Sequence, residues 1–462
     1  MATPTSTGRP LSLWHDDASY TPFDAPILDG DIQVDVAIIG AGYTGLWTAY
    51  YLAKAQPDLR IAVLESETVG FGASGRNGGW CSALFPASLK KVASLSSRDA
   101  AVRLQQAMND TVTEMGQVLA AENIDCDWKQ GGYVSIARNQ AQWARAKAEI
   151  KGWQSWGFGD EHMRLLSADE VKDQVQASHT YGGSFTPNCA AVQPVKLAAG
   201  LAGVVAKLGV KIYHHTKVTQ IGNRKLVTDR GVVTADTIVR ATEGYTAEFK
   251  EFHRDVVPMY SLMIATEPLS DDVWNKIGLG DRPTFADKRH LRIYGQRTAD
   301  GRIAFGGRGA PYHYASRVKP EFDMDARVHE MLRGILHDLL PGLEGAKFTH
   351  AWGGNLGIPR DWYPSVSYDK RAGFAQAGGY VGDGVSTAHV AGKTLAAEIL
   401  DLDDDLRELP WAKRTSPKWE VEPLRWLGVN AVTQAFAQSD RNEARSGKPS
   451  KISSTVWKMI GH

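Results

Sequence analysis

The chain has 462 residues, and its 52 Lys and Arg residues balance its 52 Asp and Glu residues. This length suffices for two or three domains with buried cores, while the neutral balance argues against nucleic acid as a partner and favours a small molecule. The three cysteines, Cys81, Cys126 and Cys189, are too few and too widely spaced for a disulfide framework or a C-x-x-C metal site, so we expect a reducing cytoplasm and no bound metal.

Residues 1–34, rich in Pro, Thr, Ser and Asp, are predicted to form an N-terminal arm ahead of the first domain. The arm contains no charged segment followed by an apolar core, so we expect no secretory signal. Trp14 and Tyr20 indicate that it packs against the rest of the protein, because large aromatic side chains are usually buried.

The stretch from Asp35 to Glu65 predicts a strand, a tight turn, a helix and a second strand. The apolar run Val36–Ile39 is typical of a buried parallel strand. It leads into a dinucleotide fingerprint, G-x-G-x-x-G, made by Gly40, Gly42 and Gly45. The motif needs these glycines for a tight turn, a close approach of the backbone to a pyrophosphate, and close packing of the helix on the strand.

The residues around this fingerprint strengthen the prediction of a dinucleotide site. Tyr43 and Thr44 open the helix, where free backbone N–H groups and the positive end of the helix dipole would meet the pyrophosphate. Glu65, followed by Ser66, ends the second strand where the motif places an acid on the ribose hydroxyls. An ordinary glycine-rich turn is the alternative. The clustered glycines disfavour a membrane helix over residues 36–53, so we expect no transmembrane segment.

A second glycine-rich segment, residues 70–79, has the sequence GFGASGRNGG and is unsuited to the interior of a helix or strand. Such a segment lets the backbone approach a ligand while its polar side chains face that ligand. A flexible surface loop is the alternative, which the following Trp80 and apolar residues disfavour. The candidate ligand-binding residues here are Gly72, Ala73, Ser74, Arg76, Asn77, Gly78, Gly79 and Trp80.

Beyond this loop, the pattern alternates between two domains. Residues 35–123, 191–250 and 346–409 are assigned to the dinucleotide-binding domain, and residues 124–190 and 251–345 to a second domain with β-rich, alternating segments. Residues 410–462 form a C-terminal extension whose tryptophans indicate packing, and we assign it no chemistry.

Two later segments assigned to the dinucleotide-binding domain contain further candidate cofactor-binding residues. Residues 211–221 predict one strand, in which the backbone of Val218 would contact the adenine, and Ala241 and Thr242 lie in a tight turn over the cofactor. A last helix is predicted with Ser386 and Thr387 at its N-cap.

Several motifs together resemble the flavin-dependent amine and amino-acid oxidases of the D-amino-acid oxidase superfamily. These are GASGRNGGW, ATEGYT, FGGRG, HAWGG and GGYVGDGVSTAHVAGKTLA, and they are most similar to the γ-glutamylputrescine oxidoreductase group and the glycine and sarcosine oxidases. The resemblance covers residues 31–400. It implies an α/β protein in which a Rossmann-like FAD-binding domain of three-layer ββα architecture is interleaved with an α+β substrate domain built on an antiparallel sheet.

The resemblance also implies which residues contact FAD. The first fingerprint would hold the pyrophosphate and the adenosine ribose, and residues 70–79 the far side of the diphosphate and the flavin ring. Residues near the last helix would complete the flavin site, with the positive end of the helix dipole toward the flavin N1 and C2 carbonyl. They are Gly354, Gly382, Asp383, Gly384 and Val385.

Four departures from the family pattern bear on chemistry. No cysteine follows Cys189, so attachment of the flavin through a late cysteine is excluded and noncovalent FAD is expected. Leu356 stands where amino-acid oxidases of this class carry an arginine for the substrate carboxylate. Arg292 stands where sarcosine oxidases carry a lysine implicated in oxygen activation, and Glu243 replaces a common asparagine.

The activity implied is oxidation of a secondary or N-substituted amine, such as a γ-glutamyl amine or an N-alkyl amino acid. A hydride passes from the substrate α-carbon to flavin N5, the imine hydrolyses to an aldehyde or oxo product plus an amine, and O2 is reduced to H2O2. Arg292 and Arg308 are the candidates for positioning substrate, with Trp80, Tyr260 and Trp352 as walls. Two alternatives stay open: a flavin dehydrogenase with another electron acceptor, and a noncatalytic FAD-binding protein.

Overall fold

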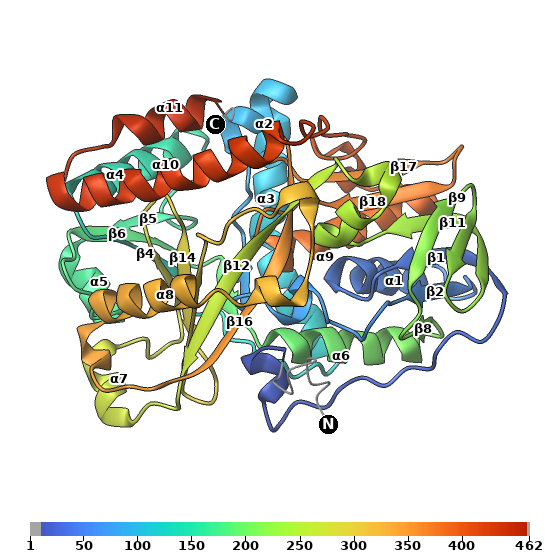
Figure 1. Cartoon of the computed structure of the whole chain (residues 1–462), viewed down its shortest axis with the longest axis horizontal. Coiled ribbons are helices and arrows are strands. Elements are labelled where there is room, and N and C mark those ends of the chain that lie inside the picture. The colour runs from blue at the N-terminus through green and yellow to red at the C-terminus, as the bar shows by residue number, and fades with distance from the viewer. Residues whose placement is uncertain (1–10, 460–462) are drawn as a thin grey trace.

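The computed structural model describes residues 11–459, which form two sheet-based units joined through the middle of the molecule (Figure 1). The first ten residues of the predicted arm lie outside the described residues. The rest of the arm is packed down as predicted, since Trp14 in the short helix η1 (Leu13–Asp16) is 2% exposed and meets Trp352 edge to face.

The first sheet has a parallel centre. Strand β1 pairs in parallel with β2 on one side and β11 on the other, in the overall order β17-β18-β11-β1-β2-β8. Its strands are β1 (Ile32–Ile39), β2 (Ile61–Leu64), β8 (Lys211–Tyr213), β9 (Val218–Gly222), β10 (Lys225–Thr228), β11 (Val232–Arg240), β17 (Ser365–Asp369) and β18 (Phe374–Gly378).

The single strand predicted over residues 211–221 is wrong, because two strands occupy this range. Strand β8 lies at the edge of the main sheet, whereas β9 pairs with β10 in an antiparallel extension of β11. The chain turns between them at His215, whose φ of 47° is incompatible with a continuous strand. This extension covers a separate apolar cluster that includes Val218 and Leu226.

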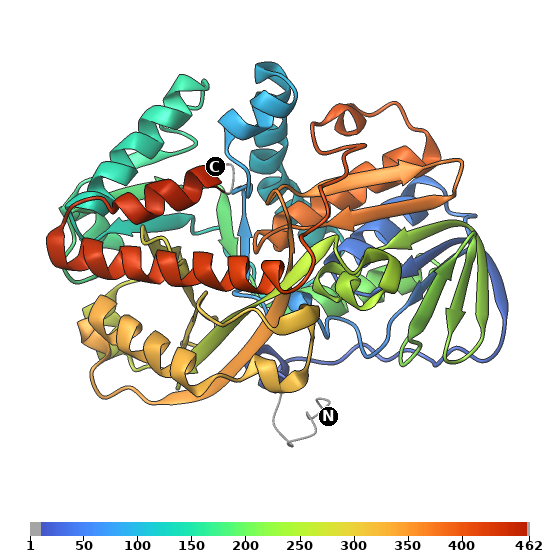
Figure 2. The same cartoon turned by 45° about the horizontal axis from the view of Figure 1, so that its top comes forward.

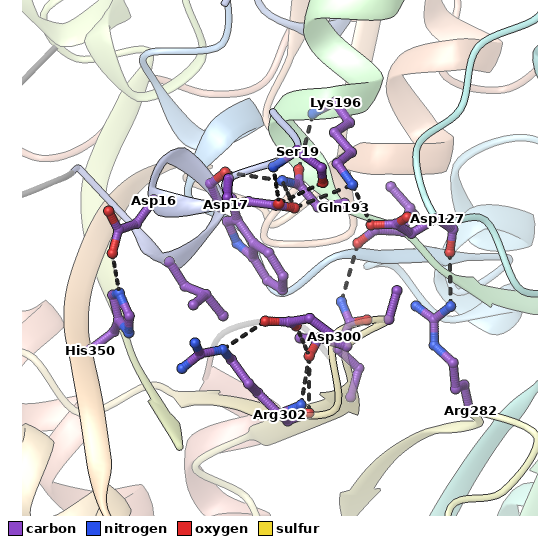
Figure 3. A pocket seen from close by; sticks show the side chains of 17 residues that line it. Asp16, Asp17, Ser19, Asp127, Gln193, Lys196, Arg282, Asp300, Arg302 and His350 are labelled. Atoms are coloured by element: carbon purple, nitrogen blue, oxygen red, sulfur yellow. Dashed lines mark hydrogen bonds and ion pairs between the residues drawn. The ribbon is translucent and has the colours of Figure 1, made fainter. Parts of the chain in front are cut away.

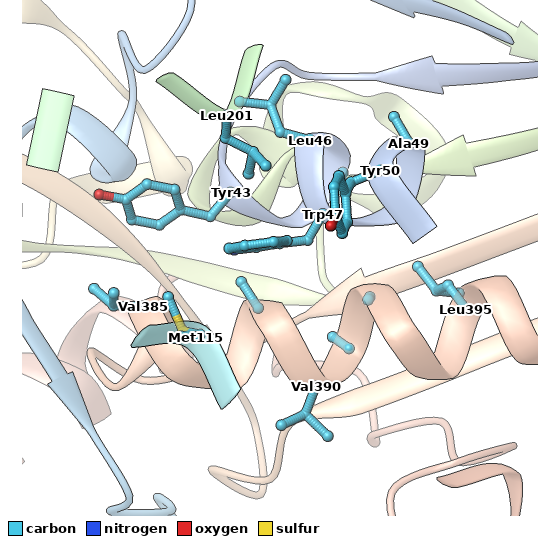
Figure 4. Close-up of a cluster of buried hydrophobic side chains, with 14 of the residues drawn as sticks. Tyr43, Leu46, Trp47, Ala49, Tyr50, Met115, Leu201, Val385, Val390 and Leu395 are labelled. Carbon is cyan, nitrogen blue, oxygen red and sulfur yellow. The ribbon is translucent and has the colours of Figure 1, made fainter. Parts of the chain in front are cut away.

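Helices cover the other face of this sheet and complete a three-layer arrangement. The main ones are α1 (Tyr43–Ala55), α3 (Arg98–Ala121), α6 (Pro194–Lys207) and α9 (Gly384–Leu400). Helices α1 and α9 pack most closely, with Trp47 of α1 over α9 (Figure 4). Their contact is possible because Gly392 has no side chain: a Cβ there would lie 2.6 Å from the Trp47 Cβ.

The Gly392→Ala variant is therefore expected to have a free energy of unfolding lower by about 1–3 kcal/mol, because the added methyl group forces two buried helices apart. The measurement is urea unfolding followed by tryptophan fluorescence. Gly334→Ala in α8 (Ala326–Leu339) is the matched control, since no atom lies within 4 Å of a Cβ there. Equal unfolding midpoints for the two variants would contradict the role of this helix contact.

The second sheet is antiparallel except where β13 pairs in parallel with β4. Its order is β16-β12-β15-β14-β13-β4-β6-β5. These strands are β4 (Tyr133–Ala137), β5 (Arg164–Leu166), β6 (Gly182–Thr186), β12 (Val256–Thr266), β13 (Thr284–Asp287), β14 (Ile293–Arg297), β15 (Ile303–Gly307) and β16 (Phe348–Pro359). The helices around it are α4 (Gln140–Ser155), α5 (Ala168–Gln174), α7 (Asp271–Ile277) and α8.

Strand β16 differs from the expectation that residues 350–357 return the chain to the first domain. It pairs with β12 from Phe348 to Pro359 and so belongs to the second sheet. The chain returns to the first sheet with β17 and β18. The reason is the long antiparallel partner, because β12 offers backbone hydrogen bonds along almost the whole of β16.

Three remaining parts connect or cover these units. Strands β3 (Trp80–Ser82) and β7 (Cys189–Ala191) form a two-stranded ribbon between the sheets, and α2 (Leu89–Leu95) precedes α3. The C-terminal extension forms α10 (Leu424–Ser446) and α11 (Lys451–Met459), which run across the side of the second sheet (Figure 2). Among the described helices, none combines the length and apolar content needed to cross a membrane.

Candidate functional site

The β1–α1 turn leaves room for nothing larger than glycine at its key positions. Gly40 has a φ of +103°, and a Cβ there would lie 2.7 Å from the Ala241 carbonyl oxygen. A Cβ at Gly45 would lie 2.0 Å from the Gly40 carbonyl oxygen. The Tyr43 N–H donates to the Ser74 hydroxyl at 2.9 Å, so the second glycine-rich loop lies directly over the start of α1. The structure thus brings these two predicted segments together.

Glu65 is held at the carboxyl end of β2, facing the same turn. Its carboxylate accepts the N–H of Ala41 at 2.8 Å and that of Glu67 at 3.0 Å, and the Ser66 hydroxyl lies at 3.3 Å. Burial raises the pKa of this carboxyl, and the hydrogen bonds oppose that effect. Val218 lies nearby in the chain, after the Thr216 N–H that donates to the Glu65 carbonyl, but its side chain is buried in the core under the β9–β10 extension.

Hydrogen bonds from distant segments fix the loop of residues 70–79. The buried Arg76 guanidinium pairs with Asp323 at 2.6 Å and also donates to the Tyr245 hydroxyl at 2.8 Å. The Asn77 side chain donates to the Ala73 and Ser74 carbonyls. These hydrogen bonds restrain the loop and disfavour the alternative of a flexible surface loop.

Arg292 and Arg308 lie together at the ends of β14 and β15. The Arg308 N–H donates to the Arg292 carbonyl at 3.0 Å, and the Arg308 guanidinium donates to the Val381 carbonyl just before α9. Asp383 lies close to both arginines: burial raises its pKa to about 6, and the two guanidinium groups act in the opposite direction. Two predicted substrate residues thus meet the predicted flavin segment, with Arg292 still exposed.

Trp80 joins an aromatic group beside these arginines. Its ring lies 5.0 Å from that of Tyr133 and 6.0 Å from that of Tyr294, and its buried indole N–H has no hydrogen-bond partner among residues 11–459. The Tyr294 hydroxyl shares a 2.7 Å hydrogen bond with Ser261, and its ring lies where a Cβ on Gly78 would collide at 2.7 Å. This group therefore adjoins the glycine-rich loop.

The other two predicted walls lie elsewhere. Tyr260 is on the opposite face of β12, where its ring packs against His313 and Phe322 and its hydroxyl meets Lys319. Trp352 lies beneath the glycine-rich loop and donates to the Arg76 carbonyl at 3.0 Å. Neither side chain joins the group formed by Trp80 and the arginines, because strand alternation and loop packing place them on other surfaces.

The last helix begins earlier than predicted. Helix α9 starts at Gly384 with Asp383 as its N-cap residue, so the N-cap assignment to Ser386 and Thr387 is wrong. Both hydroxyls are engaged differently: Ser386 donates to the Ser82 carbonyl and Thr387 to the Asp383 carbonyl. Asp383 makes no side-chain cap hydrogen bond, so the first-turn N–H groups of α9 are not capped by it. Gly382, with a φ of +106°, is exposed beside them.

The remaining flavin candidates lie along these segments. Gly354 on β16 faces the loop, since a Cβ there would lie 3.3 Å from the Arg76 Cβ. Ala241 pairs with Ile39 at the end of β11, and the Thr242 hydroxyl meets that of Thr246. Val385 is buried in the main core.

Some polar and aromatic residues at this junction were not among the sequence candidates. No sequence motif marks these residues, because they come from separate strands and loops that meet only through tertiary packing. Asn355 is the clearest: it is 2% exposed, and both polar atoms of its amide lack partners within the described part of the chain. The others are Tyr133, Tyr245, Tyr294 and Asp323.

His389 in α9 and Cys81 in β3 are both fully buried titratable residues. His389 is a hydrogen-bonded helix histidine, bonded at 2.5 Å to both the Tyr51 and Thr111 hydroxyls, and burial lowers its pKa to about 3. Cys81 is a fully buried thiol whose pKa is raised by burial, as expected of an inert core residue.

Glu243, the residue that departs from the family pattern, ties together two segments. Its carboxylate accepts the N–H of Gly379 at 2.9 Å and of Gly357 at 3.3 Å, and so connects β16 to the segment before α9. Burial raises its pKa from the ordinary value of 4.5 to about 7, against the effect of these hydrogen bonds and of Arg240.

Since the folded protein holds this proton more tightly than the unfolded chain, stability is expected to fall as pH rises from 4.5 to about 7. The loss amounts to roughly 3 kcal/mol. Glu243→Gln cannot ionise, so its stability relative to the wild type should improve across this range. Urea unfolding of both proteins at pH 5 and pH 8 measures the difference. A constant difference between the two pH values would contradict the assignment.

A cavity of about 450 Å³ lies behind the glycine-rich loop, between the arm, α6 and the β14–β15 hairpin (Figure 3). Several of its charged side chains are paired with one another, among them Lys196 with Asp17 and Asp127, and His350 with Asp16. None of the predicted site residues lines it, but Gln296 on its wall donates to the Gly78 and Gly79 carbonyls. This side chain on the cavity wall therefore holds the loop from behind.

The chain is similar to several known proteins. Residues 35–398 match the model of the DAO family, described as FAD dependent oxidoreductase. The γ-glutamylputrescine oxidoreductase of Escherichia coli is 30% identical over 387 residues, covering 82% of this chain and 86% of that protein. Sarcosine oxidase subunit beta of an Arthrobacter species is 22% identical over 348 residues, covering 72% and 78%.

Among solved structures, glycine oxidase from Geobacillus kaustophilus superimposes with a TM-score of 0.69 at 20% identity, covering 83% of this chain and 100% of that one. At this identity the likeness concerns the fold alone.

Proposed function

Because the chain belongs to the DAO family of FAD-dependent oxidoreductases, we propose that it oxidises a secondary or N-substituted amine that carries a carboxylate. A γ-glutamyl amine or an N-alkyl amino acid has this chemistry. The observation that carries the proposal is the meeting of Arg292 and Arg308 with the start of α9. Two guanidinium groups at one place favour an anionic group of the substrate. The similarity to γ-glutamylputrescine oxidoreductase supports the same class.

The residues present fit FAD at both of its ends. At the adenosine end, Gly40 and Gly42 leave the backbone open and Glu65 offers a buried carboxylate to hydroxyl donors. At the flavin end, the uncapped start of α9 favours an electron-rich group, and the unpartnered Trp80 indole offers a hydrogen-bond donor. We propose noncovalent binding, because no cysteine follows Cys189.

When bound, FAD supplies the acceptor for a hydride from the carbon that bears the amine. The chain would bind and orient the substrate through Arg292 and Arg308, while the aromatic group around Trp80 excludes water from one side. The oxidised substrate is an imine, which water hydrolyses to an aldehyde or oxo product plus an amine. The larger share of the protein's contribution is orientation, because proximity alone lowers a barrier substantially.

We propose O2 as the electron acceptor, with H2O2 as product. This choice rests on the resemblance to the oxidases of the class. The replacement of their lysine by Arg292 keeps a positive charge at that position but counts against the same oxygen chemistry. The alternative is a dehydrogenase with another acceptor. Peroxide release in air by the substrate-reduced protein separates the two, since a dehydrogenase would stay reduced until an artificial acceptor is added.

The decisive experiment is an anaerobic screen in which amines are mixed with the FAD-loaded protein and flavin absorbance is followed. We expect bleaching by γ-glutamyl amines or N-methyl amino acids, and little by simple polyamines without a carboxylate. D-amino acids serve as a further comparison. If no amine bleaches the flavin, the protein is instead a noncatalytic FAD-binding protein, and our proposal fails.

A further inference from the structure

The C-terminal helix α10 lies beyond the part of the chain that matches the family model, which ends at residue 398. It runs along the second-sheet side of the molecule (Figure 2). Its polar side chains reach two loops, one directly before β14 and one directly after β15. These loops carry Arg292 and Arg308, so the extension contacts both arginine-bearing segments.

The first contact is made by Asp440. Its two carboxylate oxygens accept the backbone N–H groups of His290 and Leu291, at 2.8 and 2.9 Å, in the two positions directly before Arg292. One carboxylate thus holds two successive peptide groups of an irregular segment. Because such N–H groups have no partner in a strand or helix, this pair of charge-assisted hydrogen bonds strongly restricts the local backbone.

A second group, one turn further along α10, holds the same loop. Glu443 pairs with Arg145 through both oxygens, at 3.0 and 2.7 Å, and with the His290 Nε2 at 3.0 Å. Arg145 in turn donates twice to the Lys288 carbonyl. His290, Asp440 and Glu443 have metal-ligating groups within 4.8 Å of one another, but both Glu443 oxygens already accept hydrogen bonds from the Arg145 guanidinium. Glu443 and Arg145 therefore stabilise the conformation of the loop that contains His290.

The other end of α10 holds the loop after Arg308. The Asn430 amide accepts the Tyr312 N–H at 3.0 Å and donates to the Tyr312 carbonyl at 3.1 Å. Glu422, before the helix, accepts the Tyr312 hydroxyl at 2.7 Å and the Ala315 N–H at 3.0 Å. Both polar groups of one peptide segment are thereby fixed by the extension.

We propose that α10 is a positioning element of the substrate site, in which Asp440 and Asn430 hold the loops that carry Arg292 and Arg308. The two guanidinium groups then bind the carboxylate of an amine substrate as a pair. This inference rests on the function proposed above. It makes the extension a determinant of specificity for carboxylate-bearing amines, because loosening either loop weakens the arginine pair.

The experiment uses Asp440→Asn in the full-length, FAD-loaded protein. The asparagine keeps the volume but loses one acceptor and the charge, so amide hydrogen exchange in residues 287–293 should become faster. The KM for a carboxylate-bearing amine should rise about tenfold, while the limiting rate of flavin reduction changes less than about threefold. Asn430→Ala should act similarly through the other loop. Gln438→Ala is the matched control, since Gln438 bonds to Asn442 and Arg441 of the same helix.

A double-mutant comparison distinguishes a positioning role of Asp440 from a general loss of stability, which would raise the KM in any background. In an Arg292→Met background, Asp440→Asn should add almost nothing to the KM, because the group it positions is already absent. Unchanged exchange in residues 287–293, or faster exchange with an unchanged KM, would overturn the inference.

If no amine reduces the wild-type flavin, the proposed function fails, and the dissociation constant of succinate, read from flavin absorbance, replaces the KM. An unchanged constant in both variants would then overturn the inference as well.

Discussion

Replacing Gly42 by alanine is expected to abolish retention of FAD while leaving the fold intact. A Cβ at this position would lie 2.9 Å from the Ser74 hydroxyl, which is the acceptor for the Tyr43 N–H. Because Ser74 is a small side chain that can move, the fold tolerates the methyl group. The pyrophosphate does not, since the motif needs bare backbone at this point. We expect FAD affinity to fall by about 100-fold or more, equivalent to roughly 3 kcal/mol.

The measurement is the flavin content after gel filtration, followed by titration of the apoprotein with FAD. Far-ultraviolet circular dichroism checks that the fold is retained. Gly203→Ala in α6 is the matched control, since nothing lies within 4 Å of a Cβ there, and it should keep its full flavin content. Full flavin content in Gly42→Ala would refute the assignment of this turn to the pyrophosphate.

The Arg308→Met variant is expected to raise the KM for a carboxylate-bearing amine by about 10- to 100-fold. Methionine retains much of the apolar stem, but it loses the charge-assisted hydrogen bonds that a carboxylate would accept, each worth about 1.5–3 kcal/mol. The limiting rate of flavin reduction should change far less, because the hydride donor is a different part of the substrate. Stopped-flow reduction over a range of substrate concentrations separates the two parameters.

Two further variants sharpen this test. Arg308→Lys keeps the charge and loses the planar fork, so its KM should lie between those of the wild type and Arg308→Met. Arg333→Met on α8 removes an arginine whose ion pair with Glu330 lies on the surface, and its kinetics should match the wild type. If Arg308→Met binds a carboxylate-bearing amine as tightly as the wild type does, the arginine pair does not recognise the substrate.

Local patterns predicted the elements with strong chemical constraints. The β1–α1–β2 unit follows from its apolar runs and three glycines, and the structure reproduces it, with β1 and β2 paired in parallel. Helices α3 and α8 each bury one face, and burial of one face imposes a 3.6-residue period on the sequence. Burial of Trp14 followed from its size alone.

The errors fall where pairing between distant segments decides the outcome. Residues 211–221 were predicted as one strand, but the turn at His215 sends β9 into another part of the sheet. Strand β16 was expected with the first domain, and its long partner β12 draws it into the second sheet. The start of α9 was misplaced because Ser386 and Thr387 resemble cap residues, whereas their hydroxyls bond to other carbonyls.

The amino-acid sequence by itself determined the family, the FAD dependence and the β1–α1–β2 unit with its glycine-rich turn. Each depends on residues that are close in the chain and whose spacing is imposed by the ligand's backbone contacts. Only the tertiary structure decided which distant side chains share the second end of the site. It separated Tyr260 from Trp80, brought Tyr294 into the group, and placed α10 against the arginine loops. Such contacts arise from strand alternation and packing between elements hundreds of residues apart, for which the sequence carries no local signal.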